Sequence, residues 1–267
     1  MVSPFKLSVC PHDTAKNPLG WFTLNTYLQR NLGIGIHFDP HDSFLEERQA
    51  VLDRPHHVVY ANPYSVLCFA RERGFVPVAR PAGIVDEAIV VARPGAPRGA
   101  ALRIASATDK LIIHDLGLKV LDGLDIDVRQ ADFHFVGNHL NAAKAVIDGT
   151  ADLGIVFNET WNGLNPSTRG QLEVVGESHD GLAFHCFMVS PEWVDKREAI
   201  QRILCAMHED PAGLRVLEDL KFKAFEPIGE EIIPVLAKLT VEPVRVCSAS
   251  LASVTAPVYM LAANPSS

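Results

Sequence analysis

The chain has 267 residues, of which 48% are hydrophobic and 21% charged, and its formal net charge is -8. This composition excludes a disordered or fibrous protein, and the length suits either one large domain or two lobes. The negative charge argues against a nucleic-acid-binding surface, which needs clustered Lys and Arg, but it leaves room for a small anionic ligand held by local donors. No stretch approaches the roughly 20 apolar residues of a membrane span.

Strand and helix patterns alternate from the N-terminus. "FKLSVCP" at residues 5–11 predicts a buried strand, and "NPLGWFTLNTYLQRNLG" at 17–33 predicts a helix that ends at Gly33. The next helix is expected to begin after Asp42 or Ser43. The alternation continues through strands at 34–40, 56–63 and 75–81 and helices at 42–54 and 64–74. It predicts an α/β fold with mostly parallel sheets covered by helices.

A second lobe is expected to follow the first. A Pro/Gly/Ala/Arg-rich stretch comes after "DEAIVVARP", and the alternation then starts again at residue 102. A long strand in "LEVVGESHDGLAFHCFMVSPEW" is expected to end at Ser190-Pro191. We therefore expect lobe 1 to comprise 1–93 and 191–267 and lobe 2 to comprise 94–190, with a ligand cleft between them. The expected crossings are 93–95 and 189–191, and the tail 247–267 is expected to be weakly ordered or partner-dependent.

Metal, cofactor and catalytic motifs are not evident. The five cysteines form no Cys-x-x-Cys pair, so we expect reduced thiols rather than a disulfide framework or a zinc knuckle. The spacings of the histidine pairs do not place both rings on one side of an element, so no metal site is predicted. There is no Gly-x-Ser-x-Gly elbow and no glycine-rich nucleotide loop. We therefore predict no catalytic residue, no metal and no cofactor.

Candidate ligand-binding residues follow the predicted strands. In "VGNHLNAAKAVIDGTADLGIV" a strand passes to a helix N-terminus at Asn138 and His139, where free N–H groups and the helix dipole attract anions. Asn138 either caps this helix or contacts the ligand. In "ASATDK", Thr108 can cap a helix or bind an oxyanion, and Asp109 either complements a helix dipole or faces the cleft. Three further residues of the first lobe either line the cleft or pack at its edge: Tyr60, Asn62 and Tyr64.

Three segments resemble the phosphonate-binding-protein family, the solute receptors of ABC-type phosphate, phosphite and phosphonate uptake. They are "YANPYSVLCFARERGFVPVARP", "FHFVGNHLNAAKAVIDGTADLGIVFNET" and "LEVVGESHDGLAFHCFMVS". The resemblance extends over about residues 5–239. It implies the two-lobed, type II periplasmic-binding-protein fold, in which the lobes close on the ligand.

The resemblance also implies site residues. Tyr60, Thr108 and His139 match ligand contacts of the family, and Glu159 matches a glutamate that can receive a ligand ammonium group. The family's Ser-Thr-Ser turn is replaced by Ala107-Thr108-Asp109, and a second acidic residue expected near position 184 or 185 is absent. These differences weaken the case for a phosphonate dianion, because a buried carboxylate repels it. His12 and His185 can complete a different pocket.

We therefore expect a non-enzymatic, monomeric solute-binding protein for a small polar or anionic ligand of the phosphonate, phosphite or phosphate kind. Its expected partner is an ABC permease or a sensor protein, with no nucleic acid and no membrane span. Two alternatives stay open: an enzyme on the same fold acting on a small heterocycle or phosphorylated metabolite, and a cytoplasmic ligand sensor. The protein is expected to be periplasmic if a leader was removed and cytoplasmic if the sequence is the complete native chain.

Overall fold

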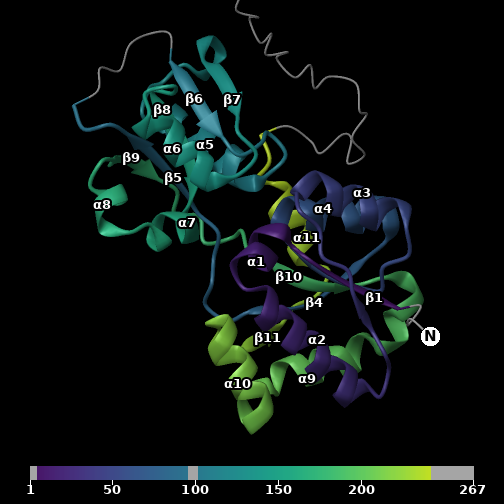
Figure 1. Cartoon of the computed structure of the whole chain (residues 1–267). Helices are drawn as coiled ribbons and strands as arrows, with labels where there is room; N and C mark the ends of the chain where they lie inside the picture. Colours follow the sequence, from purple (N-terminus) through teal and green to yellow (C-terminus); the bar gives the residue numbers. More distant parts are fainter. Residues whose placement is uncertain (1–4, 96–101, 242–267) are drawn as a thin grey trace, which may run out of the picture.

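The computed structural model describes residues 5–95 and 102–241 and places them in two α/β lobes (Figure 1). Each lobe is built on its own sheet and carries helices, so the predicted fold class is confirmed. The expectations for the first four residues and for the tail at 247–267 lie outside the described ranges. Within those ranges no helix is long and apolar enough to cross a membrane.

The first sheet has the strand order β11-β4-β10-β3-β1-β2. Strand β1 pairs in parallel with β2 and β3, whereas β10 lies antiparallel between β3 and β4. The strands are β1 (Lys6–Val9), β2 (His37–Phe38), β3 (Val58–Ala61), β4 (Val76–Pro81), β10 (Cys186–Val189) and β11 (Phe225–Pro227). The helices of this lobe are α1 (Pro11–Lys16), α2 (Pro18–Leu32), α3 (Phe44–Asp53), α4 (Pro63–Arg73), α9 (Arg197–Cys205), α10 (Pro211–Leu220) and α11 (Ile232–Ala237).

The second sheet has the order β7-β6-β8-β5-β9. Strand β6 pairs in parallel with β7 and β8, and β5 lies antiparallel between β8 and β9. The strands are β5 (Ala88–Ala92), β6 (Arg103–Ser106), β7 (Asp132–Phe135), β8 (Leu153–Phe157) and β9 (Glu173–Glu177). The helices are α5 (Ile112–Gly123), α6 (His139–Ile147), α7 (Asn158–Gly163) and α8 (Pro166–Arg169).

Both sheets are mixed rather than mostly parallel, because one strand enters each sheet from the other lobe. Strand β5 directly follows the first lobe and belongs to the second sheet, while β10 returns to the first sheet. The chain therefore crosses at residues 82–87 and 178–185, one strand earlier in each case than expected. The segment expected as one long strand contains two strands, β9 and β10, in different sheets. The crossings contact each other, since Asp86 N donates to Ala183 O at 2.8 Å.

Local capping chemistry explains where several helices begin and end. Ser43 precedes α3 and its side chain accepts a hydrogen bond from Glu46 N, so the second of the two expected caps is the correct one. Gly33 ends α2 with a φ of 68°, a left-handed conformation that glycine adopts without steric cost. The expected helix boundaries at these two positions are confirmed.

The cysteines only partly follow the sequence expectation. Cys10, Cys186 and Cys205 are free thiols, as expected. Cys68 is disulfide-bonded, so the expectation of a reduced thiol is wrong for this residue.

His114 in the second lobe gives the fold an acid-sensitive group. It is 7% exposed on α5, its Nδ1 lies 3.1 Å from Ser106 Oγ, and burial lowers its pKa to about 4. Because the folded protein holds His114 neutral, this histidine contributes to the free energy of unfolding. The contribution is present above the unfolded-state pKa of 6.5 and is lost as pH falls through about 4. The wild-type protein is expected to lose up to about 1.4 kcal/mol per pH unit through this group.

The measurement is urea unfolding at several pH values between 7 and 4. His114→Asn removes the titrating group, so its stability should fall less steeply with acid than that of the wild type. The half-exposed His134 supplies the control, and His134→Asn should follow the wild-type curve. Equal slopes for His114→Asn and the wild type would show that His114 does not titrate in this way.

Candidate functional site

A small cavity of about 20 Å³ lies between the lobes, and three histidines from three different elements meet in it. His12 comes from α1 of the first lobe, His139 from α6 of the second, and His185 from the return crossing. The remaining lining residues are Phe44, Asn62, Pro63, Asp86, Leu111, Ile112, Ile113 and Phe157. Two wider cavities adjoin it: His12, Asn138, His139 and Glu159 line one, and Tyr60, Asp86, Glu159 and His185 line the other.

The short helix α1 positions His12 at this cavity. It begins at Pro11, directly after β1, where the fixed φ of proline suits the first helical position. Cys10 N donates to Tyr60 O at 2.8 Å, which fixes the end of β1 against β3. The sequence analysis placed these residues at a strand end but did not anticipate the helix.

Glu159 of the second lobe pairs with two cationic or basic groups of the first. Its Oε2 lies 3.2 Å from His12 Nε2, and its Oε1 pairs with Lys16 Nζ. Burial alone raises the pKa of Glu159, but the hydrogen bonds from His12 and Lys16 outweigh burial and bring the pKa to about 2. The carboxylate expected to receive a ligand ammonium group is thus already partnered by the protein.

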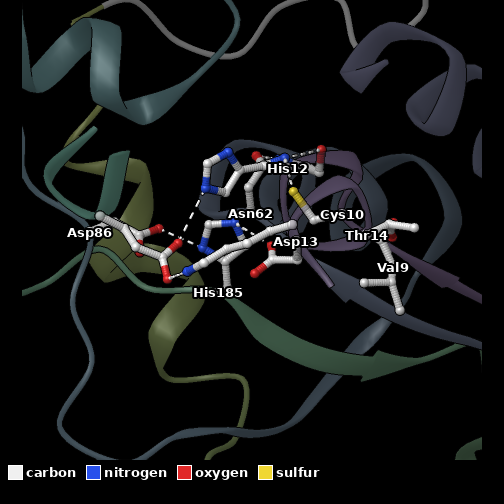
Figure 2. A network of polar contacts seen from close by, with 11 residues as sticks. Val9, Cys10, His12, Asp13, Thr14, Asn62, Asp86 and His185 are labelled. Carbon is white, nitrogen blue, oxygen red and sulfur yellow. Dashed lines mark hydrogen bonds and ion pairs between the residues drawn. The ribbon is translucent and has the colours of Figure 1, made fainter. Parts of the chain in front are cut away.

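His185 stands between two carboxylates (Figure 2). Its Nδ1 lies 2.8 Å from Asp86 Oδ2, and its Nε2 lies 3.5 Å from Asp13 Oδ2. Burial alone lowers the pKa of His185, but Asp86 and Asp13 outweigh burial and raise the pKa well above its usual value. The imidazolium compensates the negative charge at the base of the cleft.

His139 is the first residue of α6 and is only 4% exposed. Burial and the neighbouring His12 lower its pKa to about 3, so this imidazole is neutral. Its Nδ1 is buried and has no hydrogen-bond partner among the described residues. A nitrogen of a neutral imidazole at a cavity can donate a hydrogen bond to a polar ligand or accept one from it, depending on the tautomer.

Asn138 caps α6, because its side-chain oxygen accepts a hydrogen bond from Asn141 N at 2.8 Å. Asn138→Ala is expected to lower the free energy of unfolding by about 1 kcal/mol, whereas Asn138→Asp keeps a capping oxygen and the stability. Urea unfolding of the two variants measures this difference. Equal stability of the alanine variant and the wild type would exclude the cap. If the aspartate variant is as stable as the wild type but binds the ligand more weakly, Asn138 also contacts the ligand.

The aromatic and amide candidates of the first lobe have different surroundings. Tyr60 is 2% exposed, and its ring stacks on His185 with 5.7 Å between centroids. Asn62 caps α4 through Ser65 N and donates to Cys10 Sγ at 3.8 Å. Tyr64 lies under the Arg48 guanidinium, 4.8 Å from the ring centroid, and lines none of the three cavities.

Thr108 and Asp109 are not brought to these cavities. Thr108 Oγ1 donates to Asp109 Oδ1 at 3.2 Å and accepts from Lys110 N, and Asp109 is exposed. Helix α5 starts only at Ile112, and its cap position Leu111 offers no side-chain hydrogen bond. Apolar side chains therefore occupy the cavity wall at the helix start, where the family resemblance implied hydroxyl donors.

Two charged residues of the site escaped the sequence analysis. Asp86 lies in the first crossing, 99 positions before its partner His185, and no local pattern links the two. Lys16 ends α1 and pairs with Glu159 across the cleft. The segment "CPHDTAK" directly after a buried strand was the available signal, because residues at strand ends line clefts of α/β proteins.

The chain was compared with known proteins. Solved structures share its fold at low identity. XAC2383 from Xanthomonas citri bound to chloride ion has a TM-score of 0.72 and 16% identity, covering 89% of this chain and 96% of that one. PhnD1 from Prochlorococcus marinus in complex with methylphosphonate has a TM-score of 0.72 and 11% identity, covering 88% and 96%. A binding-protein component of an ABC phosphonate transporter from Pseudomonas aeruginosa has a TM-score of 0.71 and 11% identity, covering 89% and 85%.

Sequence comparison gives the family. No curated protein matches the chain. The family model described as "ABC transporter, phosphonate, periplasmic substrate-binding protein" matches residues 7–231, which is most of the chain. The resemblance that the sequence segments indicated is thereby confirmed, and this protein belongs to the family of periplasmic substrate-binding proteins of phosphonate ABC transporters.

Proposed function

We propose that this protein is a solute receptor that closes its lobes on a small polar or anionic ligand of the phosphonate, phosphite or phosphate kind. The closed form is then presented to an ABC permease, outside the cytoplasmic membrane. The observation that carries the proposal is the cavity between the lobes, where His12, His139 and His185 converge. The receptor acts as a monomer and binds neither nucleic acid nor a catalytic cofactor.

The charge of the cavity favours a ligand of low charge over a dianion. Its described lining contains no Lys or Arg, and it includes the carboxylate of Asp86. His139 is neutral, and the positive charge of His185 is shared with Asp86 and Asp13. A protonated oxyanion, or an ester of one, carries less negative charge than a dianion. It can form hydrogen bonds with the imidazoles without strong repulsion from a carboxylate whose charge is not compensated.

A receptor explains the site better than an enzyme does. Burial raises the pKa of Cys10 to about 11, so its thiol stays protonated and is a weak nucleophile. Glu159 is held ionised by His12 and Lys16 and is not free to act as a general acid. His185 is hydrogen-bonded to Cys10, but Asp86 and Asp13 raise the pKa of this histidine well above its usual value, so it is protonated and does not act as a base for the thiol.

Closure is proposed to occur about the two crossings, at 82–87 and 178–185. The ion pairs of Glu159 with His12 and Lys16 join one lobe to the other, and Arg48 Nη2 donates to Lys110 O across the same gap at 3.1 Å. These contacts exist only when the lobes are together. They stabilise the closed form and therefore raise ligand affinity.

Glu159→Gln is expected to weaken ligand binding about threefold to tenfold, mainly through faster dissociation. The ion pairs are partly exposed, so each contributes at most about 1 kcal/mol. Stopped-flow dissociation of a bound ligand measures the effect, and high salt should shrink the difference from the wild type. Glu177→Gln, at the exposed end of β9, is the matched control. If the ligand dissociates from Glu159→Gln at the wild-type rate, the ion pairs of Glu159 do not stabilise the closed form.

The experiment that tests the function is a thermal-shift and calorimetry screen of the purified protein. The ligands are methylphosphonate, aminoethylphosphonate, phosphite, phosphate and, for comparison, sulfate. A ligand at a thousandfold its Kd adds about 4 kcal/mol of stability. His139→Ala and Tyr60→Ala should lose affinity, which is measured on variants that circular dichroism shows to be folded, because Tyr60 is only 2% exposed. If none of the phosphorus oxyanions binds or raises the melting temperature, the proposed ligand class is wrong. If both variants keep wild-type affinity, the proposed cleft is wrong.

A further inference from the structure

Three side chains of different chemistry converge beside the cleft. The ligand atoms of Cys10, Asp13 and His185, namely a sulfur, a carboxylate oxygen and a ring nitrogen, all lie within 4.8 Å of one another. Cys10 is the N-cap residue of α1 and Asp13 lies in the first turn of this helix, while His185 lies just before β10. Strand β3 lies between β1 and β10, and its Tyr60 contacts both Cys10 and His185. The sheet therefore holds the three groups together over 175 positions of sequence.

The spacing of these atoms suits a metal ion better than direct hydrogen bonds. His185 Nε2 and Asp13 Oδ2 are 3.5 Å apart, beyond the ordinary 2.7–3.2 Å of an N–H···O bond. Zinc bonds of about 2.0–2.3 Å place tetrahedral ligand atoms roughly 3.3–3.7 Å apart. Asp13 Oδ2 is also a buried oxygen, and it has no hydrogen-bond partner within the part of the chain that the structure describes. A small contraction of the cluster would bring all three atoms within bonding distance of one ion.

Two residues next to the cluster contact its members in the way that the outer partners of a metal site contact the metal ligands. His185 Nδ1 lies 2.8 Å from Asp86 Oδ2, and this aspartate is 2% exposed. A carboxylate on the second ring nitrogen fixes a metal-bound histidine and strengthens it as a ligand. Asn62 Nδ2 points to Cys10 Sγ at 3.8 Å, which stabilises negative charge on sulfur. Figure 2 shows Asp86, His185 and Asp13 in succession, with the sulfur of Cys10 beside them.

We propose that Cys10, Asp13 and His185 bind a divalent transition metal of the zinc type, with Asp86 as the outer partner of the histidine. Mixed thiolate, imidazole and carboxylate ligands select zinc and cobalt over magnesium and calcium. Three protein ligands leave a fourth position, and Asp13 and His185 both line a cavity of the cleft toward which it can open. The sequence analysis predicted no metal because it weighed only histidine pairs by their spacing, and His185 lies far along the chain from Cys10 and Asp13.

The charge balance supports this site. Metal binding must displace the thiol proton of Cys10 and the Nε2 proton of the His185 imidazolium, and both protons pass to solvent as sulfur and nitrogen bond to the ion. The dication then offsets the thiolate and the carboxylate of Asp13. This inference goes beyond the proposed function, since metal binding needs no organic ligand.

A second histidine–carboxylate group in the first lobe provides a comparison. The ligand atoms of Asp39, His41 and His56 also lie within 4.8 Å of one another. There, however, Lys6 Nζ pairs with Asp39 at 2.7 Å, so an ammonium group already occupies the carboxylate. His41 therefore serves as a control for a nonspecific histidine effect.

The test uses the full chain after dialysis against a chelator, with Zn²⁺ or Co²⁺ alone as the probe. We expect one equivalent of Zn²⁺ in competition with a chromogenic chelator, and a thiolate-to-cobalt charge-transfer band with Co²⁺. Cys10→Ser should abolish that band, and Asp86→Asn should weaken Zn²⁺ affinity about 10- to 100-fold. Cys186→Ser, at the neighbouring buried thiol, and His41→Asn should retain the band and the affinity.

Circular dichroism establishes that each variant is folded, and Asp13→Asn replaces Cys10→Ser if the serine variant does not fold. Absence of stoichiometric Zn²⁺ binding by the wild type would overturn the proposal. So would a cobalt spectrum without a sulfur band, or equal affinities in wild type, Cys10→Ser and Asp13→Asn. Because no phosphonate is present, these outcomes are independent of the ligand screen that tests the proposed function.

Discussion

Replacing His185 by leucine is expected to destabilise the metal-free protein by about 3–5 kcal/mol. His185 lies between Asp86 and Asp13, and its ring nitrogens are 2.8 and 3.5 Å from their carboxylate oxygens. Leucine retains the bulk but removes the positive charge, which leaves the buried Asp86 carboxylate without its partner. The cost of an uncompensated buried charge far exceeds that of a lost surface ion pair.

The double variant Asp86→Asn/His185→Leu tests this explanation. Removing the Asp86 carboxylate as well should recover part of the lost stability, because only the Asp13 carboxylate is then left without its partner. Urea unfolding in the presence of a chelator, at pH 8, measures all four proteins of the cycle. If the double variant is no more stable than His185→Leu, the loss comes from packing against Tyr60 rather than from charge.

The fold could be predicted well from local signals. The helix cap at Ser43 and the glycine that ends α2 depend on neighbouring residues, so the sequence shows them directly. The positions of β5 and β10 depend instead on which sheet each strand joins. Both strands are fully buried apolar runs, and such a run fits either sheet equally well. The crossings were therefore expected one strand too late.

The site was predicted less completely, for a related reason. His139 and Glu159 stand at strand ends beside helix starts, and the family resemblance also marked them. The partnership of Glu159 with Lys16 spans 143 positions, and that of His185 with Asp86 spans 99. No periodicity encodes such pairings, because they arise only when two lobes and two crossings are assembled. The charge balance of the cleft was thus beyond the reach of sequence patterns.

Trp21→Ala is expected to lower the free energy of unfolding by about 3–5 kcal/mol. Trp21 is 2% exposed on α2, and the centroid of its ring lies 4.5 Å from that of the Tyr60 ring. Alanine leaves a cavity that the surrounding aromatic rings cannot fill without moving. Tyr60 in turn stacks on His185, so the same substitution removes the support of a side chain at the cleft. Ligand affinity should therefore fall even where the variant is folded.

Phe22→Ala is the matched control, because Phe22 is the next residue of the same helix and is 54% exposed. Its substitution should change stability by no more than about 0.5 kcal/mol and leave ligand affinity intact. Urea unfolding and calorimetry of both variants separate a core effect from a general weakening of α2. Similar losses in the two variants would mean that α2, rather than the Trp21–Tyr60 contact, sets the stability. A stability loss confined to Trp21→Ala, with unchanged affinity, would mean that Tyr60 holds its place at the cleft through β3 alone.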